Sequence, residues 1–377
     1  MIRARRSPGA FRRHSTLNKL GMAVAKVLTV VVATLLALVV SEIASRYLYH
    51  VEMAHFVDSN GKPTDILRND PELEFKLKPD FRGRQVGSEF QVSISTNSLG
   101  FRDSKEFAKE KGGAYRILGL GDSITFGWGV EEDQAYLSRL GKVLESELGR
   151  KVETFNLGVW GYGTIQEVKV FQQFQDYKPD LVILEFFARN VYVEEAGNDL
   201  VDNYNFEQWY KTRDLPQEVR RKEREANRSH VNATKEFVAQ HCNLCRIGVL
   251  VFGGFIRKGF HPRGNDQRTS VAWQITENEL KEFDRDLGSM NIKCLLLWAP
   301  PLGMVQAKDD SVVATLRSFG LQNIKVISAL DVLAKSPEKY YYKLDTHWRP
   351  AGQEAVAEFL AQTIVTEGFL PSITKTK

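Results

Sequence analysis

Cysteine is scarce in this chain, with three residues among 377, and glycine and proline number 28 and 12. So few cysteines exclude a small domain held together by disulfides, and this glycine and proline content is far below that of a collagen triple helix. Hydrophobic residues make up 43% and charged residues 26% of the chain, which excludes wholesale disorder. The length allows two to three domains, or one large α/β domain with additional segments.

Acidic residues are almost absent from the first 50 positions, where Glu42 is the one acid against eight lysines and arginines. The whole chain carries a net charge of +4, whereas residues 51–377 hold 43 basic and 46 acidic residues, a net charge of −3. A basic protein often binds nucleic acid or an acidic membrane surface. Here the positive charge belongs to one end of the chain, so we expect no nucleic-acid partner.

An apolar stretch, Leu20–Val40, follows the basic end and has about the 20 residues that cross a bilayer. Basic residues before it predict a cytoplasmic tail over 1–19 and a single-pass signal anchor over 20–48, with the rest of the chain in the periplasm, outside the inner membrane. A cleaved signal peptide is one alternative, but Glu42 and Ile43 fit poorly where a cleavage site needs a small residue. A buried helix of a soluble protein is another.

Residues 49–113 are polar and rich in turns. Phe90, Val92 and Ile94 alternate with polar residues, a pattern typical of a half-buried strand. We predict a membrane-proximal linker followed by a cap made of a β-ribbon.

Residues 114–368 alternate apolar runs with segments of helical periodicity. The expected strands are Arg116–Gly119, Val152–Leu157, Leu181–Phe187, Lys293–Trp298 and Ile324–Ile327. The expected helices are Asp133–Leu148, Thr164–Tyr177, Glu277–Leu287, Ser311–Phe319 and Ala351–Glu367. Nearly continuous apolar strands are typical of a parallel sheet buried on both faces. The pattern predicts a doubly wound, flavodoxin-like α/β domain with a five-stranded parallel sheet, an insertion over about residues 191–276 and a tail over 369–377.

Polar and glycine-rich motifs follow these strands. Ser123 lies in Gly-Asp-Ser after the first strand, Gly161 in a glycine-rich loop after the second, and Asn190 after the third. Asp345 and His347 precede the last helix. Acyl transfer needs a nucleophile, a base, an acid that orients the base, and donors for the developing oxyanion. All four kinds of group are therefore expected at the carboxyl edge of the sheet, where open α/β sheets bind ligands.

Together these motifs resemble the SGNH (GDSL) hydrolase family over the whole predicted α/β region. The resemblance implies that Ser123 is the nucleophile, His347 the general base and Asp345 the acid of a triad. It also implies an oxyanion hole made by the Ser123 backbone N–H, Gly161 and Asn190. No metal or organic cofactor is implied.

The motifs depart from the family pattern in two places. The family has its aspartate three residues before the histidine, where this chain has Leu344, and it has Gly-Asn-Asp where this chain has Arg189-Asn190-Val191. The Asp-x-His-Trp motif is similar to that of alginate and exopolysaccharide O-acetylation proteins, although those carry it before the serine motif. Asp122 is expected to shape the serine turn rather than to act chemically.

Aromatic residues gather in the same loops. Trp128, Trp160, Tyr162 and Trp348 are expected to contact a sugar ring or an acyl chain of the substrate, with ordinary packing at the sheet edge as the alternative. In the insertion, Cys242 and Cys245 could form a local disulfide, stay as free thiols, or make a zinc half-site. Because no second cysteine pair accompanies them, we expect no metal site.

These features predict a membrane-anchored serine esterase, or O-acyl (acetyl) transferase, that acts on envelope or secreted polysaccharide. Hydrolysis and transfer use the same acyl-enzyme, so the sequence leaves both open. A lipase or thioesterase acting on lipid esters is one alternative, and a catalytically silent carbohydrate-binding component is another. The expected partners are the ester substrate, the membrane, and envelope proteins of polysaccharide assembly.

Overall fold

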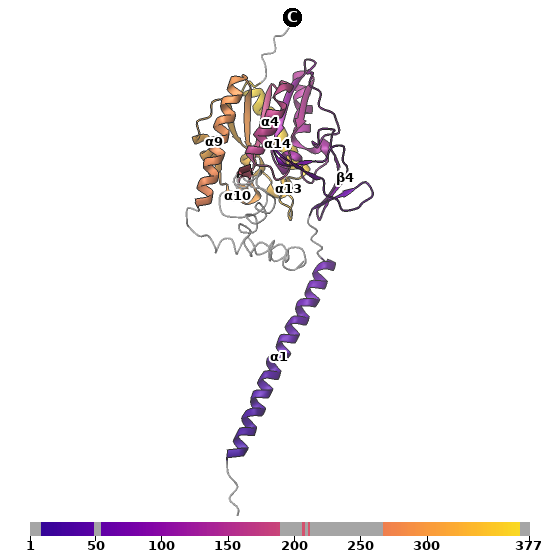
Figure 1. Ribbon diagram of the computed structural model, residues 1–377, viewed down its shortest axis with the longest axis vertical. Helices are drawn as coiled ribbons and strands as arrows, with labels where there is room; N and C mark the ends of the chain where they lie inside the picture. The colour runs from indigo at the N-terminus through magenta and orange to yellow at the C-terminus, as the bar shows by residue number, and fades with distance from the viewer. Residues whose placement is uncertain (1–8, 49–53, 189–205, 208–209, 212–266, 370–377) are drawn as a thin grey trace, which may run out of the picture. The chain divides into compact units, whose positions relative to one another are not determined.

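The computed structural model describes residues 9–48, 54–188, 206–207, 210–211 and 267–369 (Figure 1). The chain divides into two compact units. In the described residues, the first unit consists of the helix α1 (Gly9–Leu48). The second unit holds the β-strands and the remaining helices.

Helix α1 contains a segment, Val24–Ser45, that is 22 residues long and apolar enough to cross a membrane. Among the described residues, this is the one helix that meets this test. A membrane anchor and a signal sequence share these properties. The apolar N-terminal helix predicted from the sequence is therefore present, and its orientation stays a prediction.

Five parallel strands form the central sheet of the second unit, in the order β10-β9-β8-β6-β7. They are β6 (Tyr115–Leu120), β7 (Val152–Asn156), β8 (Leu181–Phe186), β9 (Lys293–Trp298) and β10 (Ile324–Ser328). This is the strand order of flavodoxin-like, doubly wound folds, and it confirms the predicted fold class. The order reverses between β6 and β8, so the loops after these two strands lie at the position where such sheets bind ligands.

Helices cover both faces of this sheet. On one face, α4 (Thr164–Phe174), α9 (Gln267–Ser289) and α11 (Ser311–Ser318) share a core with Leu118 and Val182. On the other face, α3 (Tyr136–Leu148) and α14 (Pro350–Thr366) share a core with Ile117 and Ile183. Successive residues of a strand point to opposite faces, so strands as apolar as β6 and β8 feed both cores.

Short helices are also present in the described part of the second unit. They are α2 (Ser123–Phe126), η1 (Glu132–Gln134), η2 (Gln175–Tyr177), α10 (Leu302–Ala307), α12 (Leu330–Leu333) and α13 (Pro337–Tyr340). Two helices predicted as continuous thus carry a separate 3-10 turn, η1 before α3 and η2 after α4.

Helix α9 is longer than the sequence predicts, because it begins at Gln267, ten residues before the expected start. The predicted end of the insertion, residue 276, therefore falls inside α9. Ala272, Thr276 and Leu280 lie one turn apart and are buried. The hydroxyl of Thr276 donates a hydrogen bond to the Ala272 carbonyl at 3.0 Å. Because this buried position is a polar residue, the helical spacing of apolar residues is interrupted in the sequence.

Residues 54–107, named here the N-terminal β-segment, hold more strands than the one ribbon predicted. In it β1 (His55–Asp58), β4 (Arg82–Gly87) and β5 (Phe90–Ser95) pair antiparallel, and β2 (Leu67–Asp70) pairs with β3 (Glu74–Leu77). Phe90, Val92 and Ile94 are buried, as their alternation predicts. Val92 and Ile94 belong to the same core as Leu118 of β6, so the N-terminal β-segment packs on the α/β domain. In Figure 1, β4 and α9 lie at opposite edges of the unit.

Candidate active site

Ser123 is the first residue of α2, and Gly121 and Asp122 separate it from the end of β6. Asp122 caps this helix, because its Oδ1 accepts a hydrogen bond from the Ile124 N–H at 2.8 Å. Gly121 has φ +154, a conformation that other residues rarely adopt, and a Cβ there would lie 2.2 Å from Thr125 Oγ1. The turn that presents Ser123 therefore requires glycine at 121, and Asp122 shapes it as predicted.

His347 lies beside Ser123, although 224 positions separate them. Its Nε2 is 2.8 Å from Ser123 Oγ, and its Nδ1 is 2.5 Å from Asp345 Oδ1. These are hydrogen-bond distances, as expected between a nucleophile and its base and between the base and its orienting acid. The structure thus brings together the serine, histidine and aspartate that the motifs single out.

The two-residue spacing between Asp345 and His347 depends on Thr346. Its φ is +71, a left-handed conformation that is unfavourable for a β-branched residue and costs on the order of 1–3 kcal/mol. With this turn, Asp345 Oδ1 reaches both the backbone N–H of His347 (3.4 Å) and the imidazole Nδ1. The departure from the family's three-residue spacing therefore does not separate the acid from the base.

The two aspartates of the site differ in electrostatics. Burial tends to raise the pKa of Asp345, but hydrogen bonds from His347 and from the Trp128 indole outweigh it, and the net pKa of Asp345 is lowered. Burial raises the pKa of Asp122, against its hydrogen bonds to Ile124 and Glu185. The surroundings thus favour the ionised form of Asp345 and disfavour that of Asp122.

Trp128 contacts both the acid and the base. Its indole Nε1 donates to Asp345 Oδ2 at 3.1 Å, and its ring stacks on the His347 ring with centroids 5.5 Å apart. Trp160 lies next to it at 5.8 Å and stacks on Phe56 of β1 at 4.8 Å. Trp128 and Trp160 are both half-buried, so their predicted contact with substrate is compatible with their exposure.

Tyr162 and Trp348 do not fit the predicted substrate contact, because both side chains are 0% exposed. Tyr162 donates its hydroxyl to the Phe75 carbonyl at 2.6 Å. Trp348 packs against Tyr136 in the core beneath α3 and α14. It follows His347 directly in the chain, yet its side chain lies in this core while the side chain of His347 lies beside Ser123. The prediction was wrong for these two residues because closeness in sequence does not set side-chain direction.

Gly161 lies in the loop after β7, with φ +80, and this loop is held against the serine turn. The Val159 N–H donates to the Gly121 carbonyl at 3.1 Å, and a Cβ on Gly158 would lie 2.4 Å from a backbone nitrogen of α2. The loop of Gly161 and the serine turn are therefore neighbours. Asn190 lies outside the described residues, so the full oxyanion hole stays a prediction.

The two cysteines of the insertion, Cys242 and Cys245, also lie outside the described residues. Within the described part of the chain, no group of three or more His, Cys, Asp or Glu side chains is placed to hold a metal ion.

A buried glutamate supports the serine turn from beneath. Glu185 lies in β8 and is 0% exposed. Its Oε2 accepts from the Asp122 N–H at 3.2 Å and from the Thr125 hydroxyl at 3.3 Å, and that hydroxyl also bonds Tyr136. By sequence, Glu185 belongs to the nearly continuous apolar run that predicts the strand Leu181–Phe187. A single acid near the carboxyl end of a buried strand was the available signal.

Arg102 of the N-terminal β-segment supports the loop that follows α2. It is 1% exposed, and its guanidinium donates to the carbonyl of Phe126 at the end of α2 and to those of Gly127 and Val130 in the loop. Burial lowers the pKa of Arg102 to about 10, against the opposing effect of Glu132. The side chain therefore stays charged at neutral pH.

Two further side chains of the N-terminal β-segment reach the site. Gln85 Oε1 accepts from the Gly129 N–H at 2.9 Å. The carboxylate of Glu89 accepts from the loop that carries the acid and the base, at the backbone N–H groups of Lys343, Leu344 and Asp345. Sequence motifs gave no indication of either residue.

A profile of the GDSL-like lipase/acylhydrolase family matches residues 120–355. The chain belongs to this family. The matched segment includes Ser123, Asp345 and His347 and leaves out the N-terminal β-segment. This GDSL hydrolase is thus an enzyme acting on ester bonds, as the resemblance of its motifs implied.

Several solved structures are similar to this GDSL hydrolase. The lipase/acylhydrolase from Enterococcus faecalis shares 14% identity over 67% of this chain and 96% of its own, with a TM-score of 0.38. TesA shares 14% sequence identity over 68% of this chain and 99% of its own, with a TM-score of 0.39. The acetyl xylan esterase AlAXEase shares 17% sequence identity over 66% of this chain and 99% of its own, with a TM-score of 0.36. A comparison with curated proteins found no match.

Proposed function

We propose that this GDSL hydrolase cleaves acyl esters through a covalent intermediate on Ser123. The observation that carries the proposal is the chain of hydrogen bonds from Ser123 Oγ to His347 Nε2 and from His347 Nδ1 to Asp345, at 2.8 and 2.5 Å. In this arrangement the imidazole can accept the serine proton while the carboxylate stabilises the imidazolium that forms.

The reaction has two halves. Ser123 Oγ attacks the ester carbonyl carbon as its proton passes to His347 Nε2, and the N–H groups of Ser123 and Gly161 with the Asn190 amide receive the oxyanion. His347 then gives the proton to the leaving alcohol oxygen as its bond to carbon breaks. Water, or a sugar hydroxyl, attacks the acyl-enzyme by the reverse proton path and frees Ser123.

The proposed substrates are acetyl or other short acyl esters of envelope or secreted polysaccharide. The half-buried rings of Trp128 and Trp160 support this, because Trp128 stacks on His347, Trp160 packs edge-on against Trp128, and partly exposed aromatic rings beside the catalytic histidine can contact a sugar ring. A silent carbohydrate-binding role is suggested by the irregular spacing of Asp345 and by Arg189-Asn190-Val191 in place of Gly-Asn-Asp. The spacing does not prevent contact of Asp345 with His347, and residues 189–191 lie outside the described residues. A lipid ester stays the alternative substrate, and the similarity to O-acetylation proteins stays a prediction.

The proposed location is the inner membrane, with α1 as an uncleaved anchor and the catalytic unit outside. The apolar segment Val24–Ser45 and the basic residues before it support this orientation. Protease added to intact spheroplasts should digest the catalytic unit and leave a tag at residue 1 protected. A mature protein that begins after residue 45 would instead show a cleaved signal peptide.

The proposed chemistry is tested by Ser123→Ala in the full-length protein. We expect hydrolysis of p-nitrophenyl acetate to fall roughly a thousandfold or more, together with loss of labelling by a fluorophosphonate probe. Ser289→Ala, at the end of α9, is the control and should leave both unchanged. Turnover by Ser123→Ala at the parent rate would show that the proposal is wrong.

The proposed substrate class is tested by acetate release from an O-acetylated polysaccharide, with and without an added acceptor sugar. Release without acceptor favours hydrolysis, and acetylated acceptor shows transfer. Faster turnover of phospholipid or acyl thioester than of the polysaccharide would favour the alternative substrates.

A further inference from the structure

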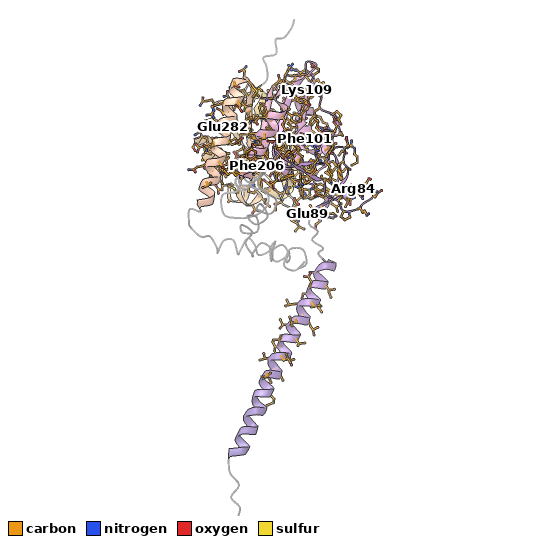
Figure 2. All side chains as sticks on the ribbon, viewed as in Figure 1. Arg84, Glu89, Phe101, Lys109, Phe206 and Glu282 are labelled. Carbon is orange, nitrogen blue, oxygen red and sulfur yellow. The ribbon has the colours of Figure 1, made fainter. Side chains whose placement is uncertain are left out.

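We infer that Glu89 is a positioning residue for Asp345 and His347, provided by a part of the chain that the family profile does not match. The inference rests on the proposed function, because it assigns Glu89 a role in the same reaction. Glu89 lies in the two-residue turn between β4 and β5, and Figure 2 labels it within the second unit.

The carboxylate of Glu89 binds three consecutive backbone N–H groups. Oε1 accepts from Lys343 at 2.9 Å, and Oε2 accepts from Leu344 at 2.6 Å and from Asp345 at 3.2 Å. Successive N–H groups that converge on one carboxylate form an anion-binding nest. Hydrogen bonds to a charged acceptor are stronger than those between neutral groups, so this contact defines the path of the backbone up to Asp345.

Trp128 holds the side chains of Asp345 and His347 in the loop that receives Glu89, whereas the backbone N–H groups before Thr346 are held by Glu89. The loop is closed by a hydrogen bond from the Tyr342 N–H to the His347 carbonyl at 2.9 Å. Leu344 is 38% exposed and gives the loop no buried apolar anchor. Thr346 holds an unfavourable left-handed conformation, and such a conformation persists only where the surroundings enforce it. Glu89 contributes to that enforcement through its hydrogen bond to the N–H of Asp345, one residue before Thr346.

The turn that carries Glu89 is itself well held. Its neighbour Phe90 packs against Tyr342 with ring centroids 5.1 Å apart. The Tyr342 hydroxyl donates to the Gly129 carbonyl at 2.7 Å, and Gln85 of β4 accepts from the Gly129 N–H. The carboxylate therefore reaches the loop from a fixed hairpin, which a positioning role requires.

Glu89→Gln in the detergent-solubilised full chain tests this inference, with p-nitrophenyl acetate as substrate. Glutamine keeps the size of the side chain but loses the charge and one acceptor oxygen. We expect kcat to fall about tenfold because a misplaced acid and base slow proton transfer, while KM stays within about twofold. Glu89→Asp, which keeps the charge on a shorter side chain, should retain an intermediate kcat.

Glu106→Gln is the matched control. Glu106 is also a carboxylate of the N-terminal β-segment that accepts a backbone N–H, that of Ser98 at 3.0 Å. Its turn carries no residue of the proposed reaction, so kcat should stay within about twofold of the parent. Thermal unfolding of each variant shows whether the fold is kept. If Glu89→Gln does not fold, Glu89→Asp takes its place, with about a threefold fall in kcat expected.

A double-mutant cycle with Asp345→Asn separates positioning from general structural support. If Glu89 acts through Asp345, adding Glu89→Gln to Asp345→Asn should lower kcat by less than about twofold further, measured at raised enzyme concentration. The inference is wrong if the two effects multiply, or if Glu89→Gln behaves like Glu106→Gln. A failure of the proposed function is distinguishable, because Ser123→Ala would then keep the parent activity.

Discussion

Trp128 and Asp345 are 217 positions apart in the chain, yet the indole Nε1 of Trp128 donates a hydrogen bond to Asp345 Oδ2 at 3.1 Å. The same indole ring stacks on His347. Trp128 follows α2, which begins at Ser123. The serine loop therefore helps to orient the acid and the base that the proposed reaction requires.

Trp128→Phe should separate the hydrogen bond from the stacking. Phenylalanine keeps a ring against His347 but cannot donate to Asp345, so one carboxylate oxygen loses its partner. We expect kcat on p-nitrophenyl acetate to fall about three- to tenfold, which corresponds to roughly 0.7–1.4 kcal/mol, with little change in KM. Steady-state kinetics measure this, and a raised KM at unchanged kcat would show that Trp128 only binds substrate.

The same substitution should change the pH dependence of stability. The pKa of Asp345 is lowered, with the Trp128 hydrogen bond among the causes, so ionised Asp345 stabilises the fold above its unfolded-state pKa, and this stabilisation is lost as pH falls. Trp128→Phe removes part of it. The difference between the free energies of unfolding at pH 7 and at pH 3 should therefore be smaller in the variant than in the parent.

Trp160→Ala and Tyr162→Phe should have opposite signatures. Trp160 is half-buried and packs against Trp128, so removal of its proposed sugar contact should raise KM for an acetylated oligosaccharide roughly tenfold, the equivalent of about 1.4 kcal/mol of binding. Tyr162 is buried and bonds the Phe75 carbonyl, so Tyr162→Phe should leave kinetics unchanged and destabilise the fold by about 1–3 kcal/mol. Kinetics and thermal unfolding of both variants measure this, and a large KM effect of Tyr162→Phe would contradict the buried position.

Arg102→Lys should destabilise the second unit by about 2–4 kcal/mol, because an ammonium group cannot replace the planar guanidinium that reaches three buried carbonyls. Denaturant unfolding followed by tryptophan fluorescence measures this. Arg84→Lys, at an exposed arginine of β4, is the control. Equal unfolding free energies for the two variants would contradict the proposed support of the loop after α2.

Asp103 should make stability fall as pH rises through the weakly acidic range. Burial, assisted by Glu132 and Glu106, raises the pKa of Asp103 to about 6. The folded protein then holds this proton more tightly than the unfolded chain does. The contribution of Asp103 to the free energy of unfolding is therefore greatest below pH 4 and falls between pH 4 and 6. Because the side chain is partly exposed, we expect a change on the order of 1 kcal/mol.

Asp103→Asn is the test of this dependence. In this variant the free energy of unfolding should no longer fall between pH 4 and 6, and at low pH it should equal that of the parent. An unfolding free energy with the same pH slope in both proteins would show that another group is responsible.

The amino-acid sequence by itself determined the strands of the sheet and the positions of the serine and histidine. The strand Lys293–Trp298 has the predicted bounds, because a continuous apolar run between polar turns has few alternatives in a doubly wound fold. Ser123 and His347 stand in short local motifs. Periodicity and motifs are local properties, so they can be read without knowledge of the tertiary structure.

Only the tertiary structure decided which side chains face the site. Trp348 adjoins His347 yet points into the core, whereas Glu89 is more than 250 positions from Asp345 and bonds its N–H. Glu185 belongs to an apolar run in the sequence, and only its hydrogen bond from the Asp122 N–H shows that it supports the serine turn. Side-chain direction and long-range hydrogen bonds depend on how distant segments pack, and no local pattern in the sequence encodes that packing.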